Sequence, residues 1–223
     1  MATKKILLVE GDNDKYVLEH ICRERGIHIN ANDIVSHRGI DVLLNKIKPR
    51  LGESDIEALG IVIDADTKKL LSERWKSLKN ILAAAGFKDI PNAPSRKGTT
   101  LPAPADSLMP RFGIWIMPNN RSPGIMEKFL QSMVPKNSRL FAHAQSSVAS
   151  IPKGARLFVK LAEPKALIHT YLAWQKEPGK PYGSAISAGI KHQGEYLDPN
   201  VPQVDDLVSW LNRLFFPEAG GRA

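Results

Sequence analysis

Short apolar runs alternate along the chain with longer stretches in which apolar residues recur at helical spacing. Residues 6–9 form a continuous apolar run, and after a polar turn the apolar positions include Tyr16, Val17, Ile21 and Cys22. A buried run followed by an amphipathic pattern is typical of a strand that leads into a helix. The chain therefore opens with a predicted βα unit, which ends near a glycine that favours a helix C-terminus.

The same plan occurs twice more. A short strand is predicted at 34–36, and the helix after it should carry Val42, Leu43 and Ile47 inward. A third apolar run at 59–63 precedes an amphipathic stretch that contains Leu71, Trp75, Leu78 and Leu82. Three successive βα units predict a parallel sheet with right-handed crossovers.

The second half of the chain is less regular. Residues 91–110 are rich in Pro, Ser, Thr and Gly, which predicts an extended surface loop with little regular structure. A fourth strand is predicted at 114–117, followed by a helix that begins near Pro123.

Three further helices are predicted after this point, around 138–150, 163–175 and 204–216. Trp174 and Trp210 lie on their apolar stripes and should face a core. We thus expect residues 1–135 to form an α/β core and residues 136–223 a helical extension packed on it, as a single compact unit.

The composition restricts the class of protein. The chain has 223 residues, of which 43% are hydrophobic and 24% charged, as in an ordinary globular protein. The single cysteine, Cys22, is expected to be a core residue in a reduced compartment. Neither a signal peptide nor a membrane span is apparent, so a cytoplasmic location without membrane contact is expected. The formal net charge of +8 favours polyanionic partners such as nucleic acid, although charge alone leaves this open.

Acidic residues follow two of the predicted strands. Glu10 comes directly after the first strand, Asp64 and Asp66 follow the third, and Asp14 lies about one helical turn beyond Glu10. The carboxyl ends of parallel strands share one edge of a sheet, so these carboxylates are expected to converge. Oxygen ligands of this kind suit a hard cation such as Mg²⁺ or Mn²⁺. Gly11 would let a phosphate approach the N-terminus of the first helix closely.

These acids also have purely structural explanations. Asp12 and Asp14 can cap the first helix and complement its dipole, which is the preferred interpretation for Asp12 and remains open for Asp14. Asp64 and Asp66 can be turn residues at a strand exit, since aspartate is common there. A glutamate–glycine pair after one strand and an Asp-x-Asp after another is nevertheless more specific than either feature alone.

The segment "LLVEGDND" followed by "IVIDADT" resembles the Toprim domain, which topoisomerases, bacterial primases and OLD-family nucleases share. The segments "GIWIMPNN", "PGIMEKFL", "KALIHTYLAWQKEPGKPYGSAI" and "VSWLNRLF" resemble the DUF3226 family of uncharacterised Toprim-like proteins, and the likeness extends over nearly the whole chain. This resemblance implies a Toprim-type, Rossmann-like sheet of about four mainly parallel strands flanked by helices, with a C-terminal helical cap.

The resemblance also implies roles for the acids. Glu10 would be a general acid–base or a metal ligand, while Asp64 and Asp66 would be metal ligands. Asp14 matches a second acid of the OLD-like pattern "VEGxxD". Glu127 would help to hold a second metal, or would simply complement the dipole of its own helix.

Other residues qualify this interpretation. The resemblance implies a carboxylate at the position of Asn119, and this departure weakens a scheme with two metals. Lys68, Lys97 and Lys165 could contact phosphates near the acidic edge, although a solvated lysine is the usual explanation for each.

The leading hypothesis is therefore a Mg²⁺-dependent phosphotransfer protein, namely a nuclease acting on DNA or RNA. The alternative is a regulatory module that binds metal, nucleotide or nucleic acid without turnover, which Asn119 and the lack of an obvious catalytic lysine favour. A homodimer remains open. The chain has no GxxxxGK[ST] motif, so an ATPase partner would have to be a separate protein.

Overall fold

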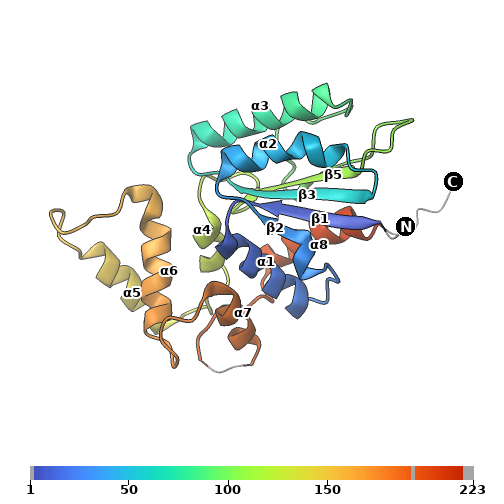
Figure 1. The fold of residues 1–223 in the computed structure, drawn as a ribbon. Coiled ribbons are helices and arrows are strands. Elements are labelled where there is room, and N and C mark those ends of the chain that lie inside the picture. Colours follow the sequence, from blue (N-terminus) through green and yellow to red (C-terminus); the bar gives the residue numbers. More distant parts are fainter. Residues whose placement is uncertain (1–2, 192–193, 218–223) are drawn as a thin grey trace.

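The computed structural model describes residues 3–191 and 194–217. Its centre is a five-stranded sheet in the order β2-β1-β3-β5-β4 (Figure 1). Four strands are parallel and the fifth, β4, pairs antiparallel with β5. The strands are β1 (Lys4–Val9), β2 (Ile34–Ser36), β3 (Ile56–Asp64), β4 (Thr99–Leu101) and β5 (Arg111–Met117). The predicted α/β class with a mainly parallel sheet is confirmed, and the architecture is consistent with a Toprim-type sheet.

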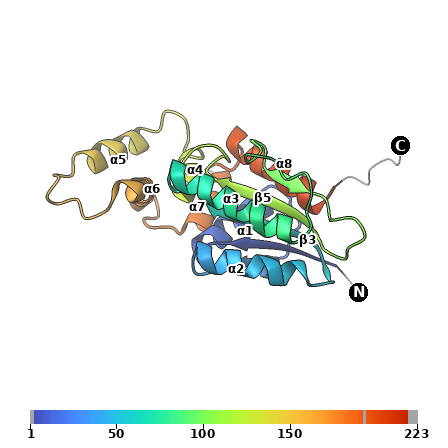
Figure 2. The ribbon, with the colours of Figure 1, turned by 90° about the horizontal axis from the view of Figure 1, so that it is seen from above.

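Helices cover both faces of this sheet. α2 and α3 lie on one face, and α1 and α8 lie on the other (Figures 1 and 2). The α-helices are α1 (Asp12–Glu24), α2 (Ile40–Leu51), α3 (Lys68–Ala84), α4 (Met126–Gln131), α5 (Arg139–Ala149), α6 (Glu163–Ala173), α7 (Tyr182–Ile190) and α8 (Pro202–Phe215), and the 3₁₀ turns are η1 (Ala31–Asp33) and η2 (Lys160–Ala162). None of the described helices is both long and apolar enough to cross a membrane.

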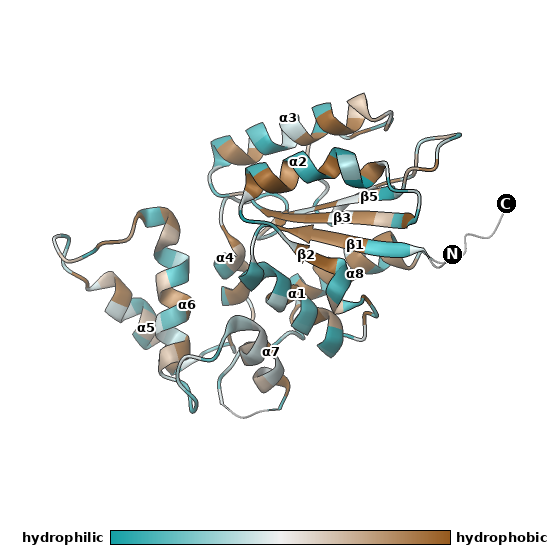
Figure 3. Cartoon of the chain, in the orientation of Figure 1, coloured by the Kyte–Doolittle hydropathy of each residue, from teal (hydrophilic) through white to brown (hydrophobic). Residues whose placement is uncertain are grey.

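The strands feed two separate cores because successive side chains point to opposite faces. In β1, Ile6 and Leu8 pack with α2 and α3, whereas Leu7 and Val9 pack with α1 and α8. The strands are accordingly apolar along most of their length, while the helices carry both hydrophilic and hydrophobic residues (Figure 3). Cys22 lies in the core between the sheet and helices α1 and α8, where it is 2% exposed, so its predicted position as a core residue is confirmed.

Two glycines let α8 lie directly on the sheet. Gly60 and Gly113 are register partners on β3 and β5. A Cβ atom at Gly113 would lie 2.4 Å from Leu214 Cδ2, and one at Gly60 would lie 2.8 Å from the same atom. Real Cβ atoms do not approach so closely, so the missing side chains make room for the C-terminal helix.

The remaining C-terminal helices are arranged differently. α7 packs against α1, whereas α5 and α6 pack against each other and α6 contacts α4. The α5–α6 pair projects to one side of the sheet (Figures 1 and 2). The extension that we predicted for 136–223 also includes residues 192–193 and 218–223, which lie outside the described residues.

Several details differ from the sequence-based expectation. The stretch 91–110 was expected to be irregular, but Thr99–Leu101 forms β4, because pairing with β5 depends on a partner that is distant in sequence. The helix expected near Pro123 begins at Met126 instead.

Three side chains expected to be apolar contacts of a core are exposed. Val42 is 44% exposed and Tyr16 is 54% exposed, since each lies one position beside the buried stripe of its helix. Trp174 is 41% exposed and rests on His143, with 5.1 Å between the ring centroids. Trp210 is fully buried, as predicted.

Candidate functional site

The carboxyl ends of β1 and β3 bring Glu10 and Asp64 together. The two strands are parallel, with Val9 opposite Val62, so the residues that follow them share one edge of the sheet. Glu10 Oε1 accepts a hydrogen bond of 2.7 Å from the backbone N–H of Asp64. The Glu10 side chain therefore fixes the backbone at Asp64.

A cavity of about 280 Å³ opens at this edge, and we call it the acidic pocket. Four elements supply its charged side chains. Its lining residues include Gly11, Asp12 and Asp14 at the start of α1, Asp64 at the end of β3, Glu127 on α4 and Lys165 on α6. The acidic pocket thus unites three of the five predicted metal ligands and two of the three predicted phosphate contacts.

Burial makes the carboxylates of this pocket reluctant to ionise. Burial, followed by the charges of Asp14, Glu10 and Glu127, raises the pKa of Asp64 from 3.8 to about 9. Burial, together with Glu10 and Glu127, raises the pKa of Asp14 to about 7. The pKa of Glu10 is also raised by burial, although the N–H of Asp64 and the charge of Arg74 oppose this. A cation in the pocket would favour the ionised, metal-ligating forms of these carboxylates.

Asp64 has an oxygen with no bonding partner. Within the described residues, its Oδ1 atom is buried and forms no hydrogen bond. Buried polar atoms are normally paired, so such an oxygen indicates a position for a bound cation or donor. The first aspartate of the Asp-x-Asp pattern is thus free to act as a ligand.

Asp66 is placed differently because of Arg74, a residue that sequence reasoning missed. Asp66 has a backbone φ of 52° and its carboxylate forms an ion pair with the Arg74 guanidinium. Arg74 also donates to the Asp64 carbonyl, and its Nη1 lies 3.9 Å from Glu10 Oε1. Asp66 is not a lining residue of the acidic pocket. Helical periodicity could have revealed Arg74, which lies two turns after Thr67 on the same helix face.

Glu127 is the centre of a small polar network. It is 6% exposed and accepts a 3.3 Å hydrogen bond from the Tyr182 hydroxyl, while Lys165 Nζ lies 3.9 Å from its Oε1. The Tyr182 hydroxyl is also 2.9 Å from His169 Nε2. A phenol has one proton, so a hydroxyl that donates to Glu127 accepts from the Nε2–H of the histidine. Burial lowers the pKa of His169 and raises that of Tyr182, which keeps both side chains neutral.

The other predicted residues have local roles. Gly11 is the N-cap of α1 with an extended φ of −149°, so its conformation does not require glycine, but a Cβ atom there would lie 3.2 Å from Asp14 Oδ2. Asp12 accepts a hydrogen bond from Ser36. Lys68 is exposed at the start of α3 and does not line the acidic pocket.

The acidic pocket can be tested for its fit to Mg²⁺. In the part of the chain that the structure describes, no three His, Cys, Asp or Glu side chains stand in position to hold one metal ion. Glu10 accepts a hydrogen bond from the Asp64 N–H, and Asp66 pairs with Arg74. Neither carboxylate is therefore directed at a common metal position with Asp64. Mg²⁺ usually keeps several waters and is bound by one or two carboxylates together with substrate phosphates. Asp64, with its free Oδ1, and Asp14 in the same pocket suit that mode of binding.

Comparisons with known proteins identify a family without a described activity. A family model described as a protein of unknown function, DUF3226, matches residues 4–216. No curated protein and no solved structure matches the chain. The match covers both the sheet and the C-terminal helices, so it includes every residue of the acidic pocket.

Proposed function

We propose that this chain, which belongs to the DUF3226 family of proteins of unknown function, is a Mg²⁺- or Mn²⁺-dependent Toprim-type phosphotransfer protein that acts as a cytoplasmic nuclease on DNA or RNA. The observation that carries the proposal is the buried Oδ1 of Asp64, which has no hydrogen-bond partner among the described residues and lies in a pocket shared with Asp14 and Glu127. Three carboxylates that lie close together beside the carboxyl edge of a parallel sheet form a typical environment for a divalent cation.

The residues of the acidic pocket have distinct proposed roles. Asp64 and Asp14 would hold the metal, and Glu127 would bind one of its waters. When bound, the metal would neutralise a phosphate and favour attack on it. Lys165 of α6 also lines the pocket and would contact a phosphate oxygen. Glu10 does not line the pocket but accepts a hydrogen bond from the backbone N–H of Asp64, which does, and its raised pKa would suit it to accept a proton from the attacking group.

A polyanionic substrate agrees with the charge of the protein. The formal net charge is +8, and such an excess raises the local concentration of nucleic acid. The acidic pocket would otherwise repel a phosphate backbone, so a divalent cation and Lys165 are needed for a phosphate to enter. Substrate and metal are therefore expected to bind in a mutually dependent way.

A second candidate is a module that binds metal and nucleic acid without turnover. The ion pair between Asp66 and Arg74 favours it, because a ligand already neutralised by a guanidinium is less available to a metal. Asn119 points the same way, since its amide oxygen is engaged by the N–H groups of Arg121 and Ser122 and stabilises a turn.

A cleavage assay separates the two candidates. Purified wild type, Asp64→Asn and Glu10→Gln would be incubated with single- and double-stranded DNA and RNA in Mg²⁺, Mn²⁺ or EDTA. Asp106→Asn is a matched control, because Asp106 is an exposed loop residue whose positive φ an asparagine also tolerates. Metal-dependent cleavage that is lost in the first two variants and kept in the control is expected.

Two other results would contradict the nuclease proposal. If calorimetry detects metal binding to wild type but no substrate is cut under any condition, the non-catalytic module is supported instead. Cleavage that persists in Asp64→Asn at matched purity would show that the activity comes from elsewhere.

A further inference from the structure

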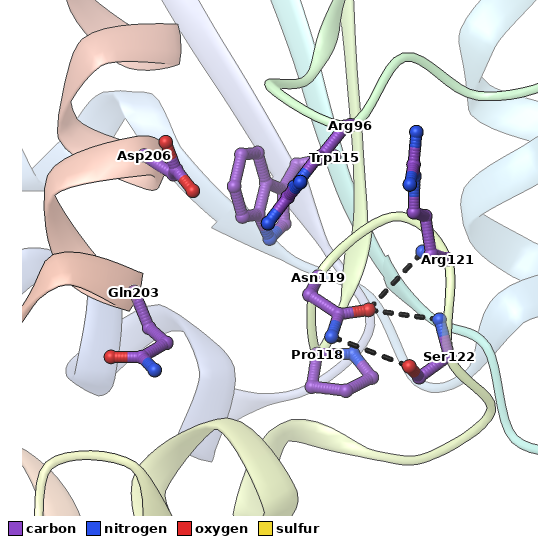
Figure 4. A pocket seen from close by; sticks show the side chains of 8 residues that line it. All are labelled: Arg96, Trp115, Pro118, Asn119, Arg121, Ser122, Gln203 and Asp206. Carbon is purple, nitrogen blue, oxygen red and sulfur yellow. Dashed lines mark hydrogen bonds between the residues drawn. The ribbon is translucent and has the colours of Figure 1, made fainter.

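A second cavity, of about 250 Å³, lies at the carboxyl end of β5 on the face of the sheet that α8 covers. We call it the Trp115 pocket. One wall is formed by Gln203 and Asp206 of α8 and another by Arg121 and Ser122 of the loop between β5 and α4, with Trp115 and Arg96 between them (Figure 4). The same loop continues into the acidic pocket at Ile125, so the two cavities are neighbours along one segment.

Trp115 lines this cavity, and its indole N–H is a buried hydrogen-bond donor without a partner among the described residues. The residue is 1% exposed. The other two buried tryptophans differ, since Trp75 donates to the Pro91 carbonyl at 3.2 Å and Trp210 donates to the Thr99 carbonyl at 3.0 Å. An indole nitrogen can only donate, so the Trp115 pocket calls for an acceptor.

Two arginines give the pocket a positive charge. Arg96 and Arg121 are exposed, and neither guanidinium forms an ion pair within residues 3–191 and 194–217. Asn119 Oδ1 accepts from the backbone N–H groups of Arg121 and Ser122, at 3.2 and 2.8 Å, and thereby fixes the turn that carries them. Guanidinium groups match the oxygens of a phosphate in geometry as well as in charge.

Asp206 narrows the class of ligand. A carboxylate repels a bare phosphate, so it should face a part of the ligand that donates hydrogen bonds. A nucleotide supplies both features, because its phosphate accepts and its ribose hydroxyls or base amino groups donate. The volume of about 250 Å³ is below the range of pockets that enclose drug-sized molecules, so it would hold the phosphate and an adjoining part of the nucleotide.

We propose that the Trp115 pocket binds the phosphate of a nucleotide, either free or within a nucleic-acid strand, through Arg96, Arg121 and the indole N–H of Trp115. Asp206 and Gln203 contact the remainder of the nucleotide. This binding does not require a metal and is independent of the chemistry proposed for the acidic pocket.

Nuclear magnetic resonance of the indole groups tests this directly. ¹⁵N-labelled protein in EDTA would be titrated with inorganic phosphate, adenosine monophosphate and a short 5′-phosphorylated single-stranded DNA, while the indole N–H signals are followed. The signal of Trp115 is identified by its loss in Trp115→Phe. The variants are Arg96→Ala and Arg121→Ala, with Arg139→Ala as a control that removes the same charge from an exposed position on α5.

The Trp115 signal is expected to shift with adenosine monophosphate at lower concentration than with inorganic phosphate. Affinity should fall about tenfold in each of the two pocket variants and stay near the wild-type value in Arg139→Ala, since one charge-assisted hydrogen bond contributes about that factor. Tighter binding of the DNA than of the mononucleotide assigns the site to a nucleic-acid strand, and the reverse order assigns it to a free nucleotide.

Three results would overturn the proposal. The first is a Trp115 signal that none of the three ligands moves. The second is an equal response in the pocket variants and in Arg139→Ala. Equal affinity for inorganic phosphate and adenosine monophosphate would reject the nucleotide assignment. Because the titration contains no divalent metal, these failures are distinct from a failure of the metal-dependent function.

Discussion

Replacing Asp64 with asparagine removes the carboxylate whose ionisation is least favourable in the folded chain. The pKa of Asp64 is raised from 3.8 to about 9 by burial and by its acidic neighbours. Without metal at pH 7.5, the folded protein keeps the proton of Asp64, whereas the unfolded chain has released it. The folded state therefore binds more protons, and the free energy of unfolding falls as the pH rises from about 4 to about 9.

The size of this effect follows from the two pKa values. At pH 7.5 the difference from 3.8 sets an upper bound of about 5 kcal/mol, at about 1.36 kcal/mol for each tenfold change in proton affinity. Asp64 is only half-buried as a whole residue, so water and side-chain relaxation reduce the penalty. We expect Asp64→Asn to raise the free energy of unfolding by about 2 kcal/mol, which is roughly 4–8 °C in Tm for a chain of this size.

Thermal and urea denaturation in EDTA, between pH 5 and pH 9, would measure this difference. The gain in stability should shrink toward pH 5, where the folded and unfolded states hold more similar numbers of protons. Mg²⁺ should stabilise wild type and have little effect on Asp64→Asn, because a ligand that binds only the folded state stabilises it by mass action. Asp106→Asn controls for the change in overall charge.

Either of two results would show that burial does not hold the proton on Asp64 in the folded protein. One is a lower Tm of Asp64→Asn than of wild type in EDTA at pH 7.5, which would mean that the carboxylate stabilises the fold. The other is a difference between the two proteins that does not change from pH 5 to pH 9.

Three further predictions concern residues around the sheet. Gly113→Ala should destabilise the protein by about 1–3 kcal/mol in urea denaturation, because the new methyl group would meet Leu214, and an unchanged midpoint would contradict the close packing of α8. Arg74→Gln should release Asp66 from its ion pair and tighten Mg²⁺ binding, measured by calorimetry, about fivefold. This factor corresponds to about 1 kcal/mol for the removal of one nearby positive charge. Unchanged or weaker binding would show that the ion pair has only a structural role. Cys22 is buried and its pKa is raised to about 12, so it should react with a thiol reagent only after denaturation, and rapid labelling of the native protein would contradict its position in the core.

The sheet could be predicted from the sequence because each parallel strand is a continuous apolar run. The runs that became β1 and β3 also point to Glu10 and Asp64, since a residue directly after a parallel strand must lie at the carboxyl edge. The edge strand β4 was missed because it has three residues, lies between glycine and proline, and depends on pairing with β5. Local patterns carry no information about such a partner.

The direction of a side chain was harder to predict than its place in the chain. Two aspartates separated by one residue would point the same way in a continued strand, but Asp66 lies past the end of β3 with a positive φ. Its carboxylate therefore meets Arg74 and not the acidic pocket. The Trp115 pocket escaped sequence reasoning for a related reason, because Arg96, Arg121 and Asp206 come from three distant segments.

The acidic pocket depends on both halves of the chain. Glu127 comes from the predicted core, but its contacts Lys165 and Tyr182 lie on α6 and α7, in the predicted extension. Tyr182 and Lys165 are the donors beside a glutamate that is 6% exposed, and a buried carboxylate without such partners is strongly disfavoured. Helices α6 and α7 are therefore part of the site, and α8 fills the space above Gly60 and Gly113 that would otherwise expose the sheet. A fragment that ends at residue 135 would lose the partners of Glu127 together with one wall of the hydrophobic core, so loss of activity in such a fragment would not identify a regulatory domain.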